Sequence, residues 1–214
     1  FLKNRDLPIQ GAKPLLMDQP NIIDHLGGNW NLKKGEFELV GSGDSAEKWK
    51  DPISLDYVCG VALFVKAEIF KKVGLFDSRF FLFWEESDWC FRAKKMGFYA
   101  TTCPEAILYH KVSASFTGGK PHTTYFWWRN RLLWIEKNCS FKEKCFLYVF
   151  NLIPKVIKML KLYVLRKLFS KKTIERQKKM QIYCAGLVGV KDYLMRKFGN
   201  GPSWVFKKIG DRAI

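Results

Sequence analysis

The segment Trp84–Trp89, with the sequence WEESDW, places three carboxylates within four residues and an indole at each end. Like charges held this close together raise the pKa of at least one of the acids. A general base works best with a pKa nearer to neutral than that of a free glutamate. One of these acids is therefore a candidate base; the alternative is an acidic first turn on an ordinary surface helix.

A helix is expected to carry these acids, over residues 85–96. Its first turn is acidic, Lys94 and Lys95 lie in its last turn, and Gly97 follows as a stop signal. Because side chains at 85, 86 and 88 leave such a helix in different directions, one acid can enter a cleft while another caps the helix. Asp88 and Arg92, four residues apart, are expected to pair on the surface.

The residues before this helix predict its supports. Residues 56–66 (DYVCGVALFVK) form a dense apolar run, which favours a buried strand. Gly60 within it marks a bulge, a close ligand approach or a simple packing need. A short helix over 67–73, ended by Gly74, is expected next. Residues 1–55 contain many glycines and prolines, which separate short strand-like pieces such as 37–40, and the region as a whole predicts irregular structure.

After the acidic helix, two short strands are expected over 98–102 and 106–110, broken by Pro104. A helix is expected over 123–137 (TTYFWWRNRLLWIEK), with aromatic and basic faces. The six cysteines are scattered without metal-ligand spacing, which favours buried free thiols in a reducing compartment.

The last third of the chain differs in charge. Residues 141–214 hold 18 Lys or Arg against four Asp or Glu, whereas residues 1–140 hold 19 against 16. In 141–169, lysines at 155, 158 and 161 take one side of a helix that Pro154 kinks or starts, and apolar residues at 157, 160 and 164 take the other. This pattern is typical of a helix that lies on an anionic membrane surface. A second helix, interrupted near 186–189, is expected over 173–197.

Several motifs in order resemble family 2 glycosyltransferases, in particular their bacterial rhamnosyltransferase-like branch. They are a buried strand with a Gly-Ala type turn at Gly60–Ala62, the segment Gly74–Phe81, the acidic helix at Glu85–Arg92 and the strand end Tyr109–His110. The resemblance covers residues 8–140, and more loosely 185–199. It implies an α/β fold, the second half of a GT-A (Rossmann-like) domain, followed by C-terminal amphipathic helices. The expected domains are residues 1–140 for acceptor binding and catalysis and 141–214 for membrane association.

The resemblance also implies roles for single residues. Glu86 matches the position of the base that deprotonates the acceptor hydroxyl, where the family usually has Asp; Asp88 is the second candidate. His110 matches a ligand of a divalent metal, Mg²⁺ or Mn²⁺, which is held mostly by residues upstream of this region. Substrate contacts are expected from Glu85, Trp84, Gly60, Arg129 and Arg131. For Trp84 the alternative is a place in the core, and for the two arginines a solvated basic face.

The function implied is inverting transfer of a sugar, with rhamnose as one candidate, from a nucleotide-sugar donor to a glycan or lipid-linked acceptor. The place implied is the cytoplasmic face of the bacterial inner membrane, with peripheral attachment. Because the family's nucleotide-binding half with its Asp-x-Asp motif is not found in these residues, we expect this chain to be an inactive fragment on its own. Two other classes remain open, a non-catalytic membrane scaffold and a basic nucleic-acid-binding protein; the lysines accompany apolar helices, so no nucleic-acid partner is predicted.

Overall fold

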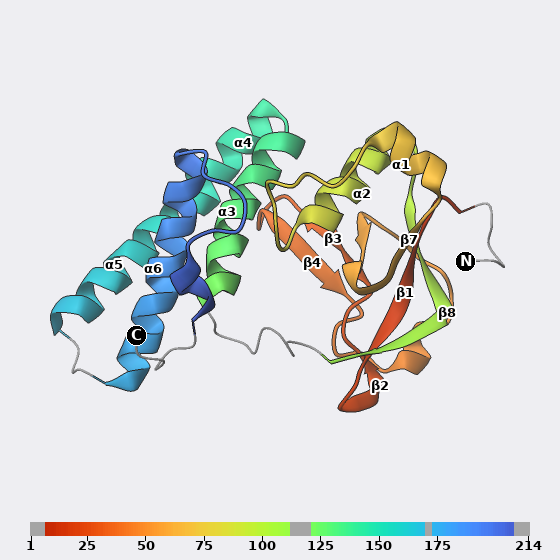
Figure 1. The fold of residues 1–214 in the computed structure, drawn as a ribbon, viewed down its shortest axis with the longest axis horizontal. Helices are drawn as coiled ribbons and strands as arrows, with labels where there is room; N and C mark the ends of the chain where they lie inside the picture. The colour runs from red at the N-terminus through yellow and green to blue at the C-terminus, as the bar shows by residue number, and fades with distance from the viewer. Residues whose placement is uncertain (1–6, 112–120, 170–172, 208–214) are drawn as a thin grey trace. The chain divides into compact units, whose positions relative to one another are not determined.

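Residues 7–111, 121–169 and 173–207 are described by the structure, which is a computed structural model. These residues divide into two units. The first holds residues 7–31, 36–77 and 85–111, and the second holds residues 32–35, 78–84 and the described residues from 121 onward. The fold is mixed α/β, as expected, with strands in the first unit and long helices in the second (Figure 1).

Strand β1 (Ile9–Leu16) is the centre of the main sheet of the first unit (Figure 1). On one side it pairs in parallel with β8 (Ala100–His110), and β8 pairs antiparallel with β5 (Ser54–Leu55). On the other side β1 pairs antiparallel with β7 (Leu63–Val65) near its start and with β2 (Gln19–Ile23) near its end. The sheet is therefore mixed.

The expectation of irregular structure over residues 1–55 is wrong. Strand β1 contains Gly11, Lys13 and Pro14, which hide its strand character in the sequence. Lys13 is nevertheless buried, and its ammonium group donates hydrogen bonds to the carbonyl oxygens of Ala46 and Trp49, at 3.4 and 3.2 Å. A buried cation is tolerated only with such partners, and these come from a distant part of the chain.

A second sheet in this unit has three antiparallel strands, β4 (Glu36–Val40), β3 (Gly27–Asn31) and β6 (Tyr57–Val58). The single buried strand expected over 56–66 is wrong, because a 3₁₀ turn at Gly60–Ala62 separates β6 from β7. The two strands expected around Pro104 are also wrong. They form one strand, β8, whose register against β1 shifts between Cys103 and Ile107, so that the proline lies in a bulge.

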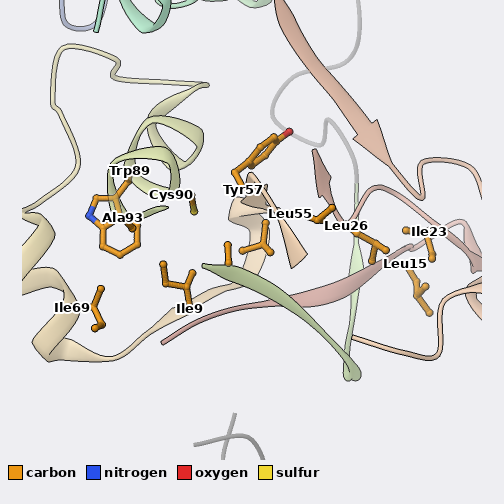
Figure 2. Packing of buried hydrophobic residues seen from close by; sticks show 12 residues of the cluster. Ile9, Leu15, Ile23, Leu26, Leu55, Tyr57, Ile69, Trp89, Cys90 and Ala93 are labelled. Atoms are coloured by element: carbon orange, nitrogen blue, oxygen red, sulfur yellow. The ribbon is translucent and has the colours of Figure 1, made fainter. Parts of the chain in front are cut away.

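Two helices contribute to the core of the first unit. Helix α1 (Ala67–Val73) ends at Gly74, which has a φ of 85°, and α2 (Glu85–Lys95) carries the acids, so both expected helices are confirmed. Figure 2 shows Trp89, Cys90 and Ala93 of α2 close to Ile69 of α1 and Ile9 of β1. The Trp89 indole also donates a hydrogen bond of 2.7 Å to the Gly74 carbonyl oxygen.

The second unit is helical. It contains α3 (Pro121–Asn138), α4 (Phe141–Leu147), α5 (Ile153–Phe169) and α6 (Ile174–Leu194). A π-helical turn at Tyr148–Leu152 joins α4 to α5 without a break in the helical backbone, and Pro154 is the second residue of α5. Helix α3 groups with the C-terminal helices, whereas the predicted division at residue 140 placed it with the catalytic part. No helix among the described residues is both long and apolar enough to cross a bilayer.

Helix α6 is continuous, so the interruption expected near its glycines is wrong. These glycines serve close packing against α3 instead. A Cβ at Gly189 would lie 2.5 Å from the Tyr125 carbonyl oxygen, and one at Gly186 would lie 3.0 Å from a carbon of the Trp128 ring. Helices α3 and α6 therefore approach each other more closely than a residue larger than glycine would allow at positions 186 and 189.

The turn from Ser78 to Trp84, in the second unit, has an unusual backbone. Phe81, Phe83 and Trp84 all have positive φ angles, of 63°, 64° and 74°. Such a conformation costs a residue with a side chain about 1–2 kcal/mol. The carbonyl oxygens of this turn are held by two consecutive residues of α3, Arg129 and Asn130.

The Asn130 amide nitrogen lies 2.8, 2.7 and 2.9 Å from the carbonyl oxygens of Phe80, Leu82 and Phe83. The Arg129 guanidinium donates to the carbonyl oxygens of Arg79 and Phe80, at 3.1 and 2.9 Å. Both side chains are fully buried. A buried carbonyl without a donor costs free energy, so these two residues stabilise a turn that is otherwise unfavourable.

Substitution of Asn130 by alanine should therefore lower the free energy of unfolding by about 2–4 kcal/mol, because the carbonyl oxygens of Leu82 and Phe83 lose the donor that Asn130 supplies. Equilibrium urea unfolding measures this change. Thr124→Ala on the same helix is the control, since the Thr124 side chain is only half-buried. If both variants lose the same stability, the amide does not hold the turn.

Candidate active site

Glu85 and Glu86 form the first turn of α2 and follow directly after the left-handed residue Trp84. Both side chains are half-buried, yet the Oε2 atom of each is shut off from solvent and has no hydrogen-bond partner in the part of the chain that the structure describes. Glu86 faces the turn that begins at Gly60. A Cβ at residue 60 would lie 3.3 Å from Cγ, Cδ and Oε1 of Glu86, so glycine lets the chain pass close to the carboxyl group.

Burial, with a smaller contribution from the neighbouring charge of Glu85, raises the pKa of Glu86 to about 7. The backbone N–H groups of Glu86 and Ser87 oppose this rise only in part. Burial also raises the pKa of Glu85. A raised pKa was expected here from the like charges, whereas in the structure burial is the larger cause and the charge of Glu85 the smaller one.

Tyr57 lies in β6 and Cys59 directly follows this strand. Both lie near the Glu86 carboxyl group. Burial raises the pKa of the Cys59 thiol to about 12, and the charges of Asp24 and Glu86 add to this rise. Burial, with the charges of Glu86 and Asp24, also raises the pKa of Tyr57 above its usual range. Asp24 and Glu86 thus act on the same two residues and belong to one neighbourhood.

His110, at the end of β8, is joined to this neighbourhood through Asp24. Its Nδ1 atom lies 2.8 Å from Oδ2 of Asp24, although the two residues are 86 positions apart in the sequence. A carboxylate on one ring nitrogen orients an imidazole and makes the other nitrogen a better ligand or proton acceptor. Among the described residues, no hydrogen bond joins His110 to Glu86 itself.

The predicted divalent metal has one candidate ligand here, the Nε2 atom of His110. The described residues contain no group of three or more His, Cys, Asp or Glu side chains placed to bind a metal ion together. One oriented imidazole fits a single position in a coordination shell but not a complete site.

Asp88, the second candidate base, has a different environment. Its side chain is fully buried, and Oδ2 accepts a hydrogen bond of 3.0 Å from Nε of Arg92. The same guanidinium donates to the carbonyl oxygens of Val73 and Leu75, so the pair ties α2 to the end of α1. The expected pairing is confirmed, but it is buried rather than on the surface. This geometry favours Glu86 over Asp88 as the base.

The second unit contains the three remaining predicted contact residues. Trp84 is 9% exposed, and its ring lies 6.4 and 6.1 Å from the rings of Trp127 and Trp134, so little of it is open to a sugar. This is the core placement that the sequence left as an alternative.

Arg129 and Arg131 are fully buried, so the solvated basic face considered for them is wrong. Arg129 donates to the turn at 79–80 and to the Gly199 carbonyl oxygen, and Arg131 donates to the carbonyl oxygens of Lys34 and Gly35. Both guanidiniums are thus directed at main-chain oxygens, and their predicted contact with a diphosphate has no support in this geometry.

The sequence matches no protein-family model, and a comparison with curated proteins likewise gives no match. The assignment of function therefore depends on the residues and on the geometry of the first unit.

Sequence reasoning missed Asp24, His25, Tyr57 and Cys59. His25 has no motif context in the sequence, yet its Nε2 lies 3.9 Å from Sγ of Cys59, and its buried Nδ1 has no hydrogen-bond partner among the described residues. No spacing relates residues 24 and 25 to the acidic helix, because strand pairing alone brings them together. His122, which likewise has no motif context, is buried and stacks on Phe206 in the second unit.

The raised pKa of Glu86 predicts how stability depends on pH. Since the folded pKa of about 7 exceeds the ordinary glutamate pKa of 4.5, the folded state holds this proton more tightly than the unfolded state. The contribution is complete below pH 4.5 and is lost as the pH rises to 7 and beyond. Glu86→Gln should therefore raise the free energy of unfolding at pH 8 by about 1–3 kcal/mol relative to the unsubstituted protein.

The pKa itself can be read from ¹³C carboxyl chemical shifts of labelled glutamate during a pH titration. Glu85→Gln should lower the Glu86 midpoint, because it removes the like charge that raises it. Glu68→Gln is the control for the loss of a carboxylate in a first helical turn, since Glu68 is an exposed residue of α1. A Glu86 midpoint near 4.5 would contradict the buried environment described here.

Proposed function

We propose that the protein is a glycosyltransferase of the inverting, nucleotide-sugar-dependent type, and that Glu86 is the base that deprotonates the acceptor. In this proposal the first unit is part of a GT-A domain and the acceptor is a glycan or a lipid-linked sugar. The observation that carries the proposal is the Glu86 carboxyl group, with a raised pKa and a buried oxygen that has no hydrogen-bond partner, facing a glycine turn.

The properties of Glu86 suit proton transfer from a hydroxyl group. A carboxylate with a pKa near 7 is a stronger base than an exposed glutamate and is still ionised in a useful fraction at neutral pH. Its free oxygen can accept a proton without first losing another partner. A Cβ at position 60 would lie 3.3 Å from Oε1 of Glu86, so glycine keeps the side of the carboxyl group that faces this turn free of a side chain.

In the proposed reaction the acceptor oxygen attacks the anomeric carbon of the donor sugar while Glu86 takes its proton. The new carbon–oxygen bond forms as the bond to the diphosphate breaks, and the electron pair leaves with the nucleoside diphosphate. A single displacement of this kind inverts the anomeric configuration. A divalent metal, where bound, would neutralise the leaving diphosphate, and His110, oriented by Asp24, is the residue of this chain suited to contact it.

The surface of the second unit supports a membrane-associated acceptor. Along α5, the apolar side chains Ile153, Ile157, Leu160, Val164 and Leu168 recur at intervals of three and four residues, and their exposed fractions run from 41% to 67%. Lys155, Lys158 and Lys161 on the same helix are also exposed. An exposed apolar stripe accompanied by lysines is the pattern of a helix that lies in the interface of an anionic membrane.

Activity should depend on Glu86. In the full-length protein, assayed for nucleoside diphosphate release from a panel of nucleotide sugars, Glu86→Gln should lower kcat/KM by about 10²–10⁴-fold, because general base catalysis is lost. The rate of the unsubstituted enzyme should rise with pH up to about 7, as Glu86 ionises. Glu85→Gln should shift this rise of the rate to lower pH.

Glu68→Gln is again the control and should retain full activity. An unchanged rate in Glu86→Gln would contradict the proposed role and favour a non-catalytic scaffold. Loss of activity with a melting temperature far below that of the control would instead show that the substitution unfolds the protein, and Glu86→Asp, which keeps the carboxylate, then separates the two effects by its partial activity.

Membrane binding should depend on the apolar stripe of α5. In flotation with vesicles containing anionic lipid, the double variant Ile157→Asn/Leu160→Asn should partition about tenfold more weakly than the unsubstituted protein, since two partly exposed side chains lose their transfer free energy. Leu75→Asn is the matched control, because Leu75 is 78% exposed but lies in the first unit. A protein that stays in solution at low salt would contradict membrane attachment.

A further inference from the structure

A cavity of about 330 Å³ lies in the second unit, beside the C-terminal end of α6. It is lined by α3, by α6 and by the segment 197–204 that follows α6. This volume is at the low end of the range for small-ligand sites and suits one small ring with its substituents. None of the residues discussed above as the candidate active site lines it.

Aromatic side chains form part of the wall. Trp204 lies in the 3₁₀ turn Ser203–Phe206, which is fixed by the fully buried Val205 against Tyr125 and Ala185. The Phe198 ring is held by two cations, since the guanidinium carbons of Arg79 and Arg129 lie 5.7 and 5.9 Å from its centroid. These rings are therefore fixed before any ligand arrives.

Polar groups complete the lining. Asp192 accepts a hydrogen bond of 2.8 Å from the Tyr125 hydroxyl on Oδ2, and among the described residues no donor is bonded to its Oδ1. Asn200 and Lys197, both exposed, add an amide and an ammonium group. Gly201 lets the chain pass over the Tyr125 ring, because a Cβ there would lie 2.5 Å from it and the φ angle is +67°.

This combination selects among ligand classes. A purely apolar ligand would leave the carboxylate and the amide without partners in a partly closed site, which costs free energy. A nucleotide or another strong anion would meet the Asp192 carboxylate. A neutral sugar ring presents carbon–hydrogen faces to aromatic rings and hydroxyl groups at its edge to carboxylate and amide groups, so it matches both kinds of wall.

We infer that this cavity, formed by Trp204, Phe198, Asp192 and Asn200, is a binding site for one pyranose ring. The inference rests on the proposed function only for the origin of that ring, which would be a sugar of the acceptor glycan. The binding itself needs neither donor nor turnover.

Saturation-transfer difference NMR with a panel of neutral methyl pyranosides tests this. At least one glycoside should bind with a Kd of about 1–10 mM, as expected for a single sugar ring. Asn200→Ala and Asp192→Asn should each weaken that binding by about fivefold or more, since each removes a hydrogen-bonding group or a charge from it. The absence of saturation transfer from every glycoside would overturn the inference.

Two further variants locate the binding. Trp204→Phe keeps an aromatic ring and should bind more weakly, whereas Lys207→Ala, an exposed neighbour outside the cavity, should bind as the unsubstituted protein does. Binding that is equal in all variants would place the sugar elsewhere and would overturn the inference. Circular dichroism melting of each variant shows that it is folded, and Asn200→Ala, at an exposed position, keeps the test valid where Trp204→Phe is unstable.

Glu86→Gln separates this inference from the proposed function. Because Glu86 does not line the cavity, the variant should bind the glycoside normally even though its transfer activity is lost. Normal binding with unchanged activity in this variant would remove the proposed catalytic role and leave the sugar site standing. If activity depends fully on Glu86 but no glycoside binds, the catalytic role stands and the sugar site is overturned.

Discussion

The turn before α2 depends on a backbone conformation that its own residues disfavour. Three residues between Phe81 and Trp84 have positive φ angles, although none of them is glycine. The carbonyl oxygens of Phe80, Leu82 and Phe83 in this turn accept hydrogen bonds from Arg129 and Asn130, two buried polar side chains of α3. Strained backbone of this kind persists only where surrounding interactions hold it. The residue after the strained segment is Glu85, the first residue of α2.

The start of α2 matters because of where two carboxyl groups then lie. In a first helical turn, Glu85 and Glu86 receive some stabilisation from backbone N–H groups, but burial and mutual repulsion outweigh it and raise the pKa of both. The Asp88 carboxylate, three residues after Glu85, is instead neutralised by an ion pair with Arg92. The acids of this turn therefore differ: Asp88 ties the helix to its neighbour, whereas Glu86 has a raised pKa, which suits the role of base proposed for it.

The two units differ in how their polar groups are used. In the first unit, ionisable residues from separate strands and from α2 gather around Tyr57 and Cys59. In the second, buried cations are directed at main-chain oxygens and stabilise turns, while the exposed face of α5 carries apolar residues and lysines. This division agrees with a reaction in one unit and binding of a surface or a ligand in the other.

Helices α1, α2 and α3 could be predicted from the sequence, since their signals are local: amphipathic spacing, acidic first turns and glycine stops. The same local signals pointed to the three acids of α2 as a group and to the lysine-bearing face of α5, whereas only the family resemblance singled out Glu86. Strand β1 could not be predicted, because its lysine and proline are acceptable only with partners that lie far away in the chain. For the same reason, the Asp24–His110 pair and the burial of Arg129 and Arg131 were decided by the tertiary structure alone. Hydrogen bonds between distant residues leave no periodicity in a sequence, and the burial that shifts a pKa exists only once the chain has folded.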